Sequence, residues 1–321
     1  MELLLQKIGD VYGLKLRLVE KVSQGFLSEN YILSDGVTKY FLKKYRYSDR
    51  AVVEGVHRSK RFFFEGGIPV IMPLPTGDGG TFFEYEAKFY TLFPFVADRQ
   101  LQWNEVHGDS LVSYAQTLAR IHILGRNATV AVSHFFKPWD SVATLKTIDA
   151  ILQKISELQT KTEFDVLAEK NLKLKEKVIS SNNKTYSEFN MESDHLLHGD
   201  YTVANVFFGT DGNVSYVFDW EKTEYAPRFL EMFRSLIQCT LGDHARSKIY
   251  LDAYLALYPA TREELERGLD AYALKQTHSL WIEEEHYLKG STRTDVLIES
   301  DSFKIDYFAH KLDEFKREVF H

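Results

Sequence analysis

The feature of this sequence that most limits its fold is a single change of pattern along the chain. From about residue 19 to residue 95, short aromatic and β-branched runs alternate with turn residues, which is typical of β-strands. One helix interrupts them at about residues 50–64, before a Gly-Gly-Ile-Pro stop. After Pro94, apolar residues recur every three or four positions, beginning with residues 109–124, which predicts helices.

This pattern predicts an α+β chain in two parts. Residues 1–95 are expected to form a small antiparallel sheet with one helix, and residues 96–321 a larger, mainly helical part. In the first part, Asp35-Gly36 predicts a hairpin turn, and two further strands are expected on either side of the glycine-rich turn at residues 76–80. Strand character returns only briefly, between residues 195 and 219.

The composition excludes several classes of function. A net charge of -7 and a pI near 5.9 argue against a nucleic-acid partner and suit small cationic substrates better. The single cysteine, Cys239, excludes an intramolecular disulfide and a zinc site built on several thiolates. The chain has no basic, apolar leader and no run near the roughly 18 apolar residues of a membrane span. We therefore expect a soluble, cytoplasmic protein with no membrane partner.

The stretch HGDYTVANVFFGTDGNVSYVFDWE, residues 198–221, carries the strongest chemical signal. Asn205 follows five positions after Asp200, and Asp219 comes after the next apolar strand. One carboxylate can orient an attacking hydroxyl and accept its proton, while an amide oxygen and a second carboxylate hold Mg²⁺ on phosphates. Magnesium prefers such hard oxygen ligands and keeps several waters, so two protein ligands suffice. The spacing fits a phosphoryl-transfer site.

The alternative interpretation is an ordinary β-hairpin with polar ends, because Asp and Asn are common in turns. The chain contains its own comparison in His107-Gly108-Asp109, whose fifth following residue is Tyr114. There Asp109 or Ser110 fits the N-cap of a helix, so HGD alone carries little information. The longer pattern of HGD, Asn and a strand ending in Asp-Trp-Glu is far more specific. No GxxxxGK[ST] motif is present, which excludes a Walker-type ATP site.

Several segments together resemble one enzyme superfamily. HGDYTVANVFF, VFDWE, the helix ending LARIH, and the N-terminal SQGFLSENYIL and YFLKKYR look like the aminoglycoside phosphotransferase and choline kinase superfamily. The resemblance covers roughly residues 21–232. It implies a two-lobed, protein-kinase-like fold with a nucleotide-binding lobe at residues 1–95 and a catalytic, acceptor-binding lobe at residues 96–321.

The resemblance also implies roles for the residues of the long motif. Asp200 corresponds to the catalytic aspartate, and Asn205 and Asp219 correspond to the two magnesium ligands. His198 corresponds to the catalytic-loop histidine, which shapes the loop and is not itself a base. Glu231 stands where relatives often have an aspartate that braces this loop; the alternative is a solvated residue in the first turns of a helix.

For the cofactor, the resemblance implies ATP with Mg²⁺. A strand points Lys43 and Lys44 to opposite faces, so one of them can enter the cleft, and the family alignment favours Lys43. Its usual helix partner would be Glu54; the alternative for both is a surface charge.

The rest of the nucleotide site is expected in a loop and at a hinge. The loop residues are Ser23, Gly25 and Ser28, and this loop has fewer glycines than the GxGxxG of protein kinases. The adenine hinge is expected at Phe93 and Phe95.

Two features favour a small-molecule acceptor over a protein. Gly199 and Thr202 stand where regulated protein kinases carry Arg and Lys, and the start of a helix near Arg228 leaves no room for an activation segment. A protein Ser/Thr kinase and a non-catalytic pseudokinase remain alternatives. Acidic residues of late helices line the acceptor pocket in aminoglycoside kinases, so Trp281, Glu283 and Glu284 are candidate contacts; the alternative is a solvated face of one helix running from Leu265 onward. The resemblance leaves the acceptor open among aminoglycosides, amino alcohols, sugars and other metabolites.

Overall fold

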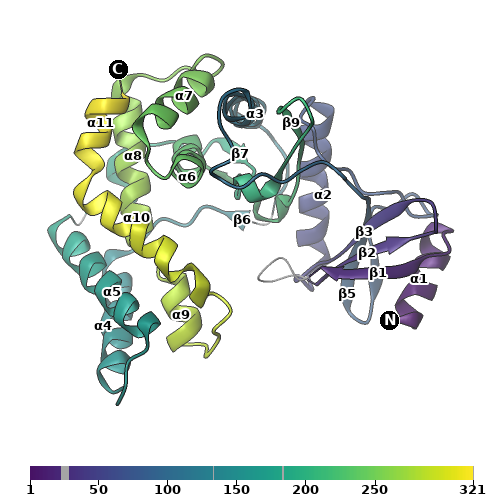
Figure 1. Ribbon diagram of the computed structural model, residues 1–321, viewed down its shortest axis with the longest axis horizontal. Helices are drawn as coiled ribbons and strands as arrows, with labels where there is room; N and C mark the ends of the chain where they lie inside the picture. Colours follow the sequence, from purple (N-terminus) through teal and green to yellow (C-terminus); the bar gives the residue numbers. More distant parts are fainter. Residues whose placement is uncertain (23–28, 133, 183, 321) are drawn as a thin grey trace. The chain divides into compact units, whose positions relative to one another are not determined.

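The computed structural model describes residues 1–22, 29–132, 134–182 and 184–320. The chain forms two compact units (Figure 1). The first, unit 1, contains residues 1–135 and 194–226, and the second, unit 2, contains residues 136–193 and 227–321. The boundary near residue 96 that the sequence predicts falls inside unit 1, so the division into two functional lobes stays a prediction.

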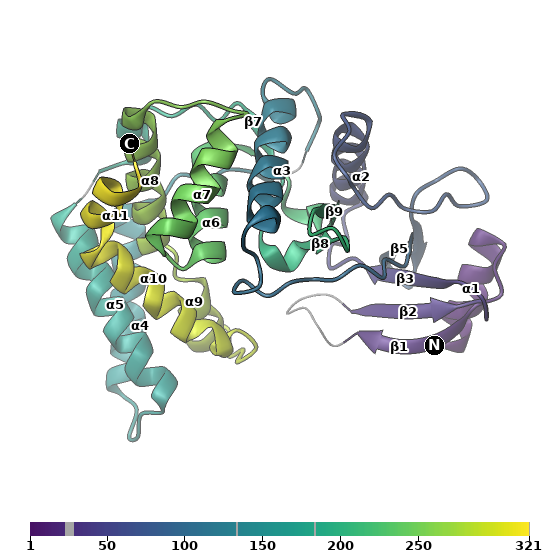
Figure 2. The same cartoon turned by 45° about the horizontal axis from the view of Figure 1, so that its top comes forward.

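Unit 1 begins with a five-stranded antiparallel sheet and two helices, as Figures 1 and 2 show. The strand order is β1-β2-β3-β5-β4. The elements are α1 (Glu2–Tyr12), β1 (Arg17–Val22), β2 (Asn30–Ser34), β3 (Lys39–Lys44), α2 (Arg50–Glu65), β4 (Phe83–Tyr85) and β5 (Lys88–Pro94). The expected small sheet, its Asp35-Gly36 hairpin and the helix α2 are confirmed, while α1 was not predicted.

The two faces of this sheet carry different side chains because neighbouring residues of a strand point to opposite sides. Leu42 and Leu92, paired across β3 and β5, lie in an apolar cluster with Leu4 and Ile8 of α1. The other face carries Lys43, which is paired with Thr91. Helix α2 packs on this second face.

The predicted turn at residues 76–80 does not join two strands. This segment precedes both β4 and β5, and the turn between them lies at Glu86 and Ala87, which have φ values of 49° and 54°. The glycine-rich segment instead closes on itself, since Thr76 N–H donates to the carbonyl oxygen of Gly80 at 2.9 Å. A Gly-rich turn signal therefore located a loop correctly but not the strands beside it.

The remainder of unit 1 holds the expected short strands next to one long helix. The N-cap of helix α3 is Gly108, and no side chain caps this helix end. The prediction that Asp109 or Ser110 is the N-cap is therefore wrong. The strand β10 lies between β6, with which it is parallel, and β7, with which it is antiparallel. The elements are α3 (Asp109–Gly125), β6 (His134–Phe135), β7 (His195–Leu197), η2 (Val203–Asn205), β8 (Val206–Phe208), β9 (Val214–Val217), η3 (Trp220–Lys222) and β10 (Glu224–Ala226).

All regular secondary structure among the described residues of unit 2 is helical. An apolar cluster including Ile151, Leu172, Ile282 and Ile298 joins α4, α5, α9 and α10. The elements are α4 (Ser141–Ser156), α5 (Glu163–Ser181), η1 (Tyr186–Phe189), α6 (Arg228–Thr240), α7 (His244–Leu255), α8 (Arg262–Thr277), α9 (Trp281–Tyr287), η4 (Asp295–Leu297), α10 (Ile298–His310) and α11 (Leu312–Val319).

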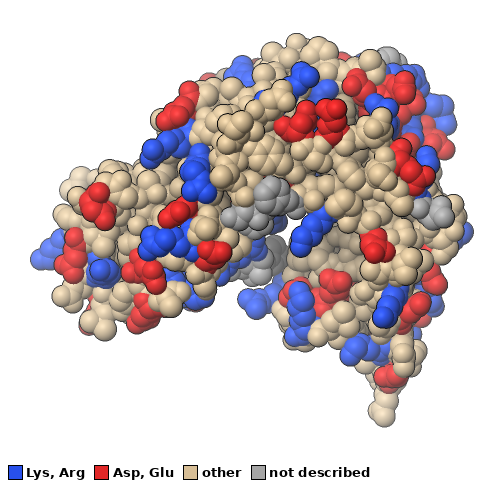
Figure 3. All heavy atoms as spheres, turned by 180° about the vertical axis from the view of Figure 1, so that it is seen from behind, with Lys and Arg blue, Asp and Glu red and all other residues tan. Residues whose placement is uncertain are grey.

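One predicted late helix is two helices in the structure. The α8 helix ends at Thr277 and α9 begins at Trp281, with His278 as the C-cap of the former. None of the helices in the described ranges has the length and apolar content required to span a membrane. On the face shown in Figure 3, acidic and basic side chains are interspersed.

Candidate active site

The loop after β7 is organised around His198. The Nδ1 atom of this fully buried histidine accepts a hydrogen bond from the Asp200 N–H at 3.2 Å. Its Nε2 therefore carries the proton and donates to the Phe218 carbonyl oxygen at 2.8 Å. One neutral imidazole thus ties the loop that carries Asp200 to the strand end that carries Asp219. These two hydrogen bonds are the contacts that the predicted loop-shaping role of His198 requires.

Glycine at position 199 is required by close backbone contact. Gly199 has a φ of 82°, and a Cβ built there would lie 1.8 Å from the Lys222 carbonyl oxygen. Any side chain would push the loop away from the segment after β9. The Gly of HGD therefore fixes the distance between the two acidic ends of the motif.

Asp200 is the acidic residue at the centre of this loop. Its Oδ2 accepts from Lys222 Nζ at 2.9 Å, and the lysine side chain is 47% exposed. Tyr201 anchors the next position, since its hydroxyl donates to the Tyr114 carbonyl oxygen of α3 at 2.9 Å and the two rings stack. Asp200 is thus held on a rigid support and paired with a side chain that reaches solvent.

Asn205 and Asp219 form a donor set that fits Mg²⁺. The Asn205 Nδ2 donates to the Asp200 carbonyl oxygen at 2.9 Å, which leaves Oδ1 of the amide as an acceptor. Asp219 has a left-handed backbone with a φ of 62°, an uncommon conformation for a residue other than Gly. Among the residues with described positions, no group of three His, Cys, Asp or Glu side chains could hold a metal. The Asn205 amide and the Asp219 carboxylate are oxygen ligands of the kind that Mg²⁺ accepts.

Lys43 lies between two carboxylates of the same segment. Its Nζ is 2.7 Å from Asp219 Oδ1 and 2.6 Å from Glu221 Oε1. Burial acts to lower the pKa of Lys43, but the two carboxylates outweigh it and raise the pKa above its ordinary value. Burial acts in the opposite direction on Asp219, where the Lys43 charge prevails and lowers the pKa of the carboxyl. Lys43 and Asp219 are therefore both ionised at neutral pH.

The prediction that Glu54 is the ion-pair partner of Lys43 is wrong. Glu54 points away from the site, with a side chain 43% exposed, and pairs with Arg58 one turn later at 3.9 Å. Glu221 takes the place of the expected partner because the segment after β9 approaches Lys43 more closely than that face of α2 does. The choice between the two lysines is as expected, since Lys44 points to the other side and pairs with Glu29 at 2.6 Å.

The two hinge candidates have different environments. Phe93 is buried, and Lys60 of α2 lies over its ring at 4.2 Å. Phe95 is 36% exposed beneath Lys39. The predicted nucleotide loop, with Ser23, Gly25 and Ser28, falls outside the described residues.

Residues 19–266 match a protein family described as the phosphotransferase enzyme family. The match covers most of the chain. The chain belongs to this family. The enzyme class that its motifs predict is thereby confirmed. No curated protein sequence matches this phosphotransferase.

Solved structures similar to this phosphotransferase share its fold at low sequence identity. A spectinomycin phosphotransferase, in complex with ADP and spectinomycin, is 14% identical with a TM-score of 0.69, over 98% of both chains. A microcompartment-associated aminopropanol kinase is 14% identical with a TM-score of 0.64, also over 98% of both chains. The amicoumacin kinase hAmiN, in complex with AMP-PNP, Ca²⁺ and Ami, is 13% identical with a TM-score of 0.62, over 95% of this chain and 92% of that one. The predicted protein-kinase-like fold class agrees with these likenesses.

The predicted acceptor contacts of the phosphotransferase do not act as one group. Glu283 is fully buried and its Oε1 pairs with Lys175 Nζ at 2.9 Å, so this carboxylate is a structural residue of unit 2. Trp281, the first residue of α9, is 44% exposed, and Glu284 is half-buried. Glu231 is also buried, which excludes the solvated alternative for it.

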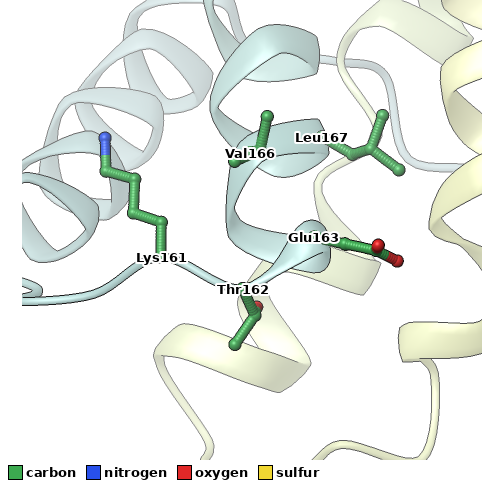
Figure 4. Close-up of a pocket in the computed structure, with 5 residues that line it drawn as sticks. All are labelled: Lys161, Thr162, Glu163, Val166 and Leu167. Atoms are coloured by element: carbon green, nitrogen blue, oxygen red, sulfur yellow. The ribbon is translucent and has the colours of Figure 1, made fainter.

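A cavity of about 390 Å³ opens at the start of α5 in unit 2 (Figure 4). It contains none of the predicted site residues. Its lining residues are Lys161, Thr162, Glu163, Val166 and Leu167.

Two charged residues of the site escaped prediction. Glu221 was visible as the end of the Asp-Trp-Glu pattern, but its pairing with Lys43 joins positions distant in sequence. Lys222 follows it directly and reaches Asp200 because a 3₁₀ turn reverses the chain at Trp220. The sequence signal that could have found them is the run of charged residues Asp219, Glu221 and Lys222 around Trp220, which is fully buried in the structure.

Proposed function

We propose that this protein is an ATP- and Mg²⁺-dependent kinase that transfers the γ-phosphate to a hydroxyl group of a small molecule. The observation that supports this most is the meeting of Lys43, Asp219 and Glu221 with the Asp200–Asn205 loop inside one compact unit. The ADP and AMP-PNP of the similar structures support a nucleotide donor. A soluble, cytoplasmic enzyme with no nucleic-acid partner is part of the proposal.

In this proposal each residue of the site has one task. Lys43 holds the phosphates of the nucleotide, and Asn205 and Asp219 would bind Mg²⁺, which neutralises charge on the phosphates when bound. Asp200 orients the acceptor hydroxyl and accepts its proton as the oxygen attacks phosphorus. His198 keeps Asp200 in position through the Asp200 N–H.

The acceptor class that fits best is an amino-substituted alcohol. Spectinomycin and aminopropanol appear in the names of two similar proteins, and the net charge of -7 favours a cationic acceptor.

The test measures ADP release from ATP with Mg²⁺ against a panel of amino alcohols, aminoglycosides, sugars and amino acids. Asp200→Asn is the blank, because it should still bind nucleotide while turnover falls by at least a hundredfold. Asp219→Ala should lose nucleotide binding that depends on Mg²⁺. Normal turnover in either variant would contradict the assignment. Transfer of label to a protein instead would favour a protein kinase, and absence of MgATP binding would favour a pseudokinase.

A further inference from the structure

Helix α2 carries a lysine that the proposed mechanism does not use. Lys60 is 4% exposed, and its Nζ lies 4.2 Å from the centre of the Phe93 ring. Within the described ranges, no carboxylate forms an ion pair with it. A buried ammonium without a carboxylate partner costs free energy that a hydrophobic residue of the same size would not cost. Such a residue in a nucleotide site calls for a functional explanation.

The surroundings of Lys60 are the proposed phosphate site. Phe93 pairs with Phe41 across β5 and β3, two positions along from the Lys43 and Thr91 pair, so Phe93 and Lys43 lie on the same sheet face. One turn later on the same helix, Phe63 packs on the segment after β9, since its ring lies 4.7 Å from the Trp220 ring. Lys60 thus lies against β5, the neighbour of the strand that carries Lys43, and one helical turn from the contact between α2 and the segment that carries Asp219 and Glu221.

The balance of charges around Glu221 indicates a function for Lys60. Of the side chains that the structure describes, Lys43 alone forms an ion pair with both Asp219 and Glu221. When nucleotide phosphates engage Lys43, its share in neutralising Glu221 falls, and the side chain of Glu221 is only 8% exposed. Arg46 Nε approaches the second oxygen of Glu221 at 3.7 Å, which is a weak contact. A further cation on the α2 side would offset the added negative charge.

We propose that Lys60 is a second cation of the nucleotide site, which balances Asp219 and Glu221 while Lys43 contacts the phosphates. It is a positioning residue, because it acts on the phosphates through these two carboxylates. This inference rests on the proposed use of a nucleotide.

The protonation of Lys60 agrees with such a role. Burial lowers its pKa to about 7, and the positive charge of Lys43 acts in the same direction, while Glu221 and Asp219 oppose them. The lysine is therefore largely neutral in the empty protein above pH 7. Anionic phosphates nearby favour its charged form, so nucleotide binding should take up a proton.

The titratable groups around Lys60 keep their protonation states over the same pH range. His57 of α2 has its pKa lowered to about 2 by burial and by Lys60 and other cations, so it remains neutral. Lys43 of β3 has a raised pKa and remains charged, and burial raises the pKa of Tyr45, which stays protonated. The lowered pKa of Asp219 keeps that carboxyl ionised. Lys60 is therefore the group that titrates near pH 7 among these.

The experiment measures MgADP binding by calorimetry at pH 7.5 in two buffers with different ionisation enthalpies. The wild type should take up a fraction of a proton, and its affinity should fall as the pH rises from 7 to 8.5. Lys60→Met should bind MgADP about tenfold more weakly, without proton uptake. The matched control is Lys44→Met, since Lys44 is the neighbour of Lys43 on the opposite face and should leave both readouts unchanged.

Unfolding temperature separates this role from a structural one. Lys60→Met should be as stable as the wild type or more so, because it removes a buried amine whose charged form has no ion-pair partner. Proton uptake by the wild type needs no variant, so the test survives a variant that fails to fold. Lys60→Met with unchanged affinity and proton uptake, or a wild type that binds MgADP without proton uptake, would overturn the role of Lys60 alone. A wild type that does not bind MgADP would overturn the proposed function with it.

Discussion

Each unit of this phosphotransferase buries a lysine between two carboxylates, and the two clusters differ in their access to solvent. In unit 1, Lys43 contacts Asp219 and Glu221, and the Asp219 side chain is 38% exposed. In unit 2, Lys175 contacts Glu283 and Asp301, whose side chains are 1% and 11% exposed. Lys43, Asp219 and Glu221 therefore form a partly solvent-exposed cluster in unit 1, called the reachable cluster. Lys175, Glu283 and Asp301 form a buried one in unit 2, called the sealed cluster.

The contacts around the two clusters differ in the same way as their exposure to solvent. Lys175 donates a further hydrogen bond to the Ser279 carbonyl oxygen at 2.8 Å, so its ammonium has three protein partners. Asp219, in contrast, has a left-handed backbone and lies close enough to Asp200 for that charge to act on it. A buried ammonium with three protein partners serves the fold, whereas exposed and strained charges mark a place for chemistry.

The largest effect should come from breaking the sealed cluster. Lys175→Met leaves two buried carboxylates without their cation, so the free energy of unfolding should fall by about 3–5 kcal/mol. Denaturant unfolding measures this. Lys289→Met, which removes an exposed pair with Glu285, is the control and should change stability by less than about 0.5 kcal/mol. Equal stabilities of the two variants would show that the sealed cluster has no structural role.

The reachable cluster should respond in activity more than in stability. Lys43→Met should lower kcat/KM for ATP by about 10²–10³-fold, because it removes a preorganised cation from the phosphates. Its free energy of unfolding should fall less than that of Lys175→Met, since the partly exposed Asp219 can be hydrated. Steady-state kinetics and denaturant unfolding of both lysine variants test the contrast. A larger stability loss in Lys43→Met would reverse the assignment of the two clusters.

A smaller effect is expected at Lys222, which pairs with Asp200. Lys222→Met should lower kcat by about tenfold and leave KM for ATP near its wild-type value, because the lysine orients the acidic group and not the nucleotide. Lys222→Arg should restore part of the rate. Kinetics with the acceptor found in the panel provide the measurement. A rise in kcat would mean that the lysine blocks Asp200 in the empty enzyme.

The smallest effect is expected at Glu54, where the structure replaces the predicted partner of Lys43. Glu54→Gln should change kcat/KM for ATP by less than about twofold, since the side chain is exposed and pairs only with Arg58 among the described side chains. Glu221→Gln serves as the comparison and should lower it much more. Equal losses in the two variants would restore Glu54 as the functional partner.

Short-range patterns were sufficient for much of this protein. The spacing of Asp200, Asn205 and Asp219 located the loop and the strand end that form the candidate site, because a tight loop and a hairpin keep residues near in sequence close in space. Strand alternation allowed only one of Lys43 and Lys44 on the cleft side of β3, and the family resemblance selected Lys43. Helix α2 was located with little error from its apolar period and its glycine stop.

The sequence by itself thus determined the α+β class, the family and the residues of the long motif, since each depends on neighbours a few positions apart. The tertiary structure decided which charges meet. Glu221, not Glu54, pairs with Lys43, Lys60 faces the same site without a carboxylate of its own, and Glu283 is sealed against Lys175. These pairings depend on the rotation of helices and on the approach of distant segments, which no local pattern encodes.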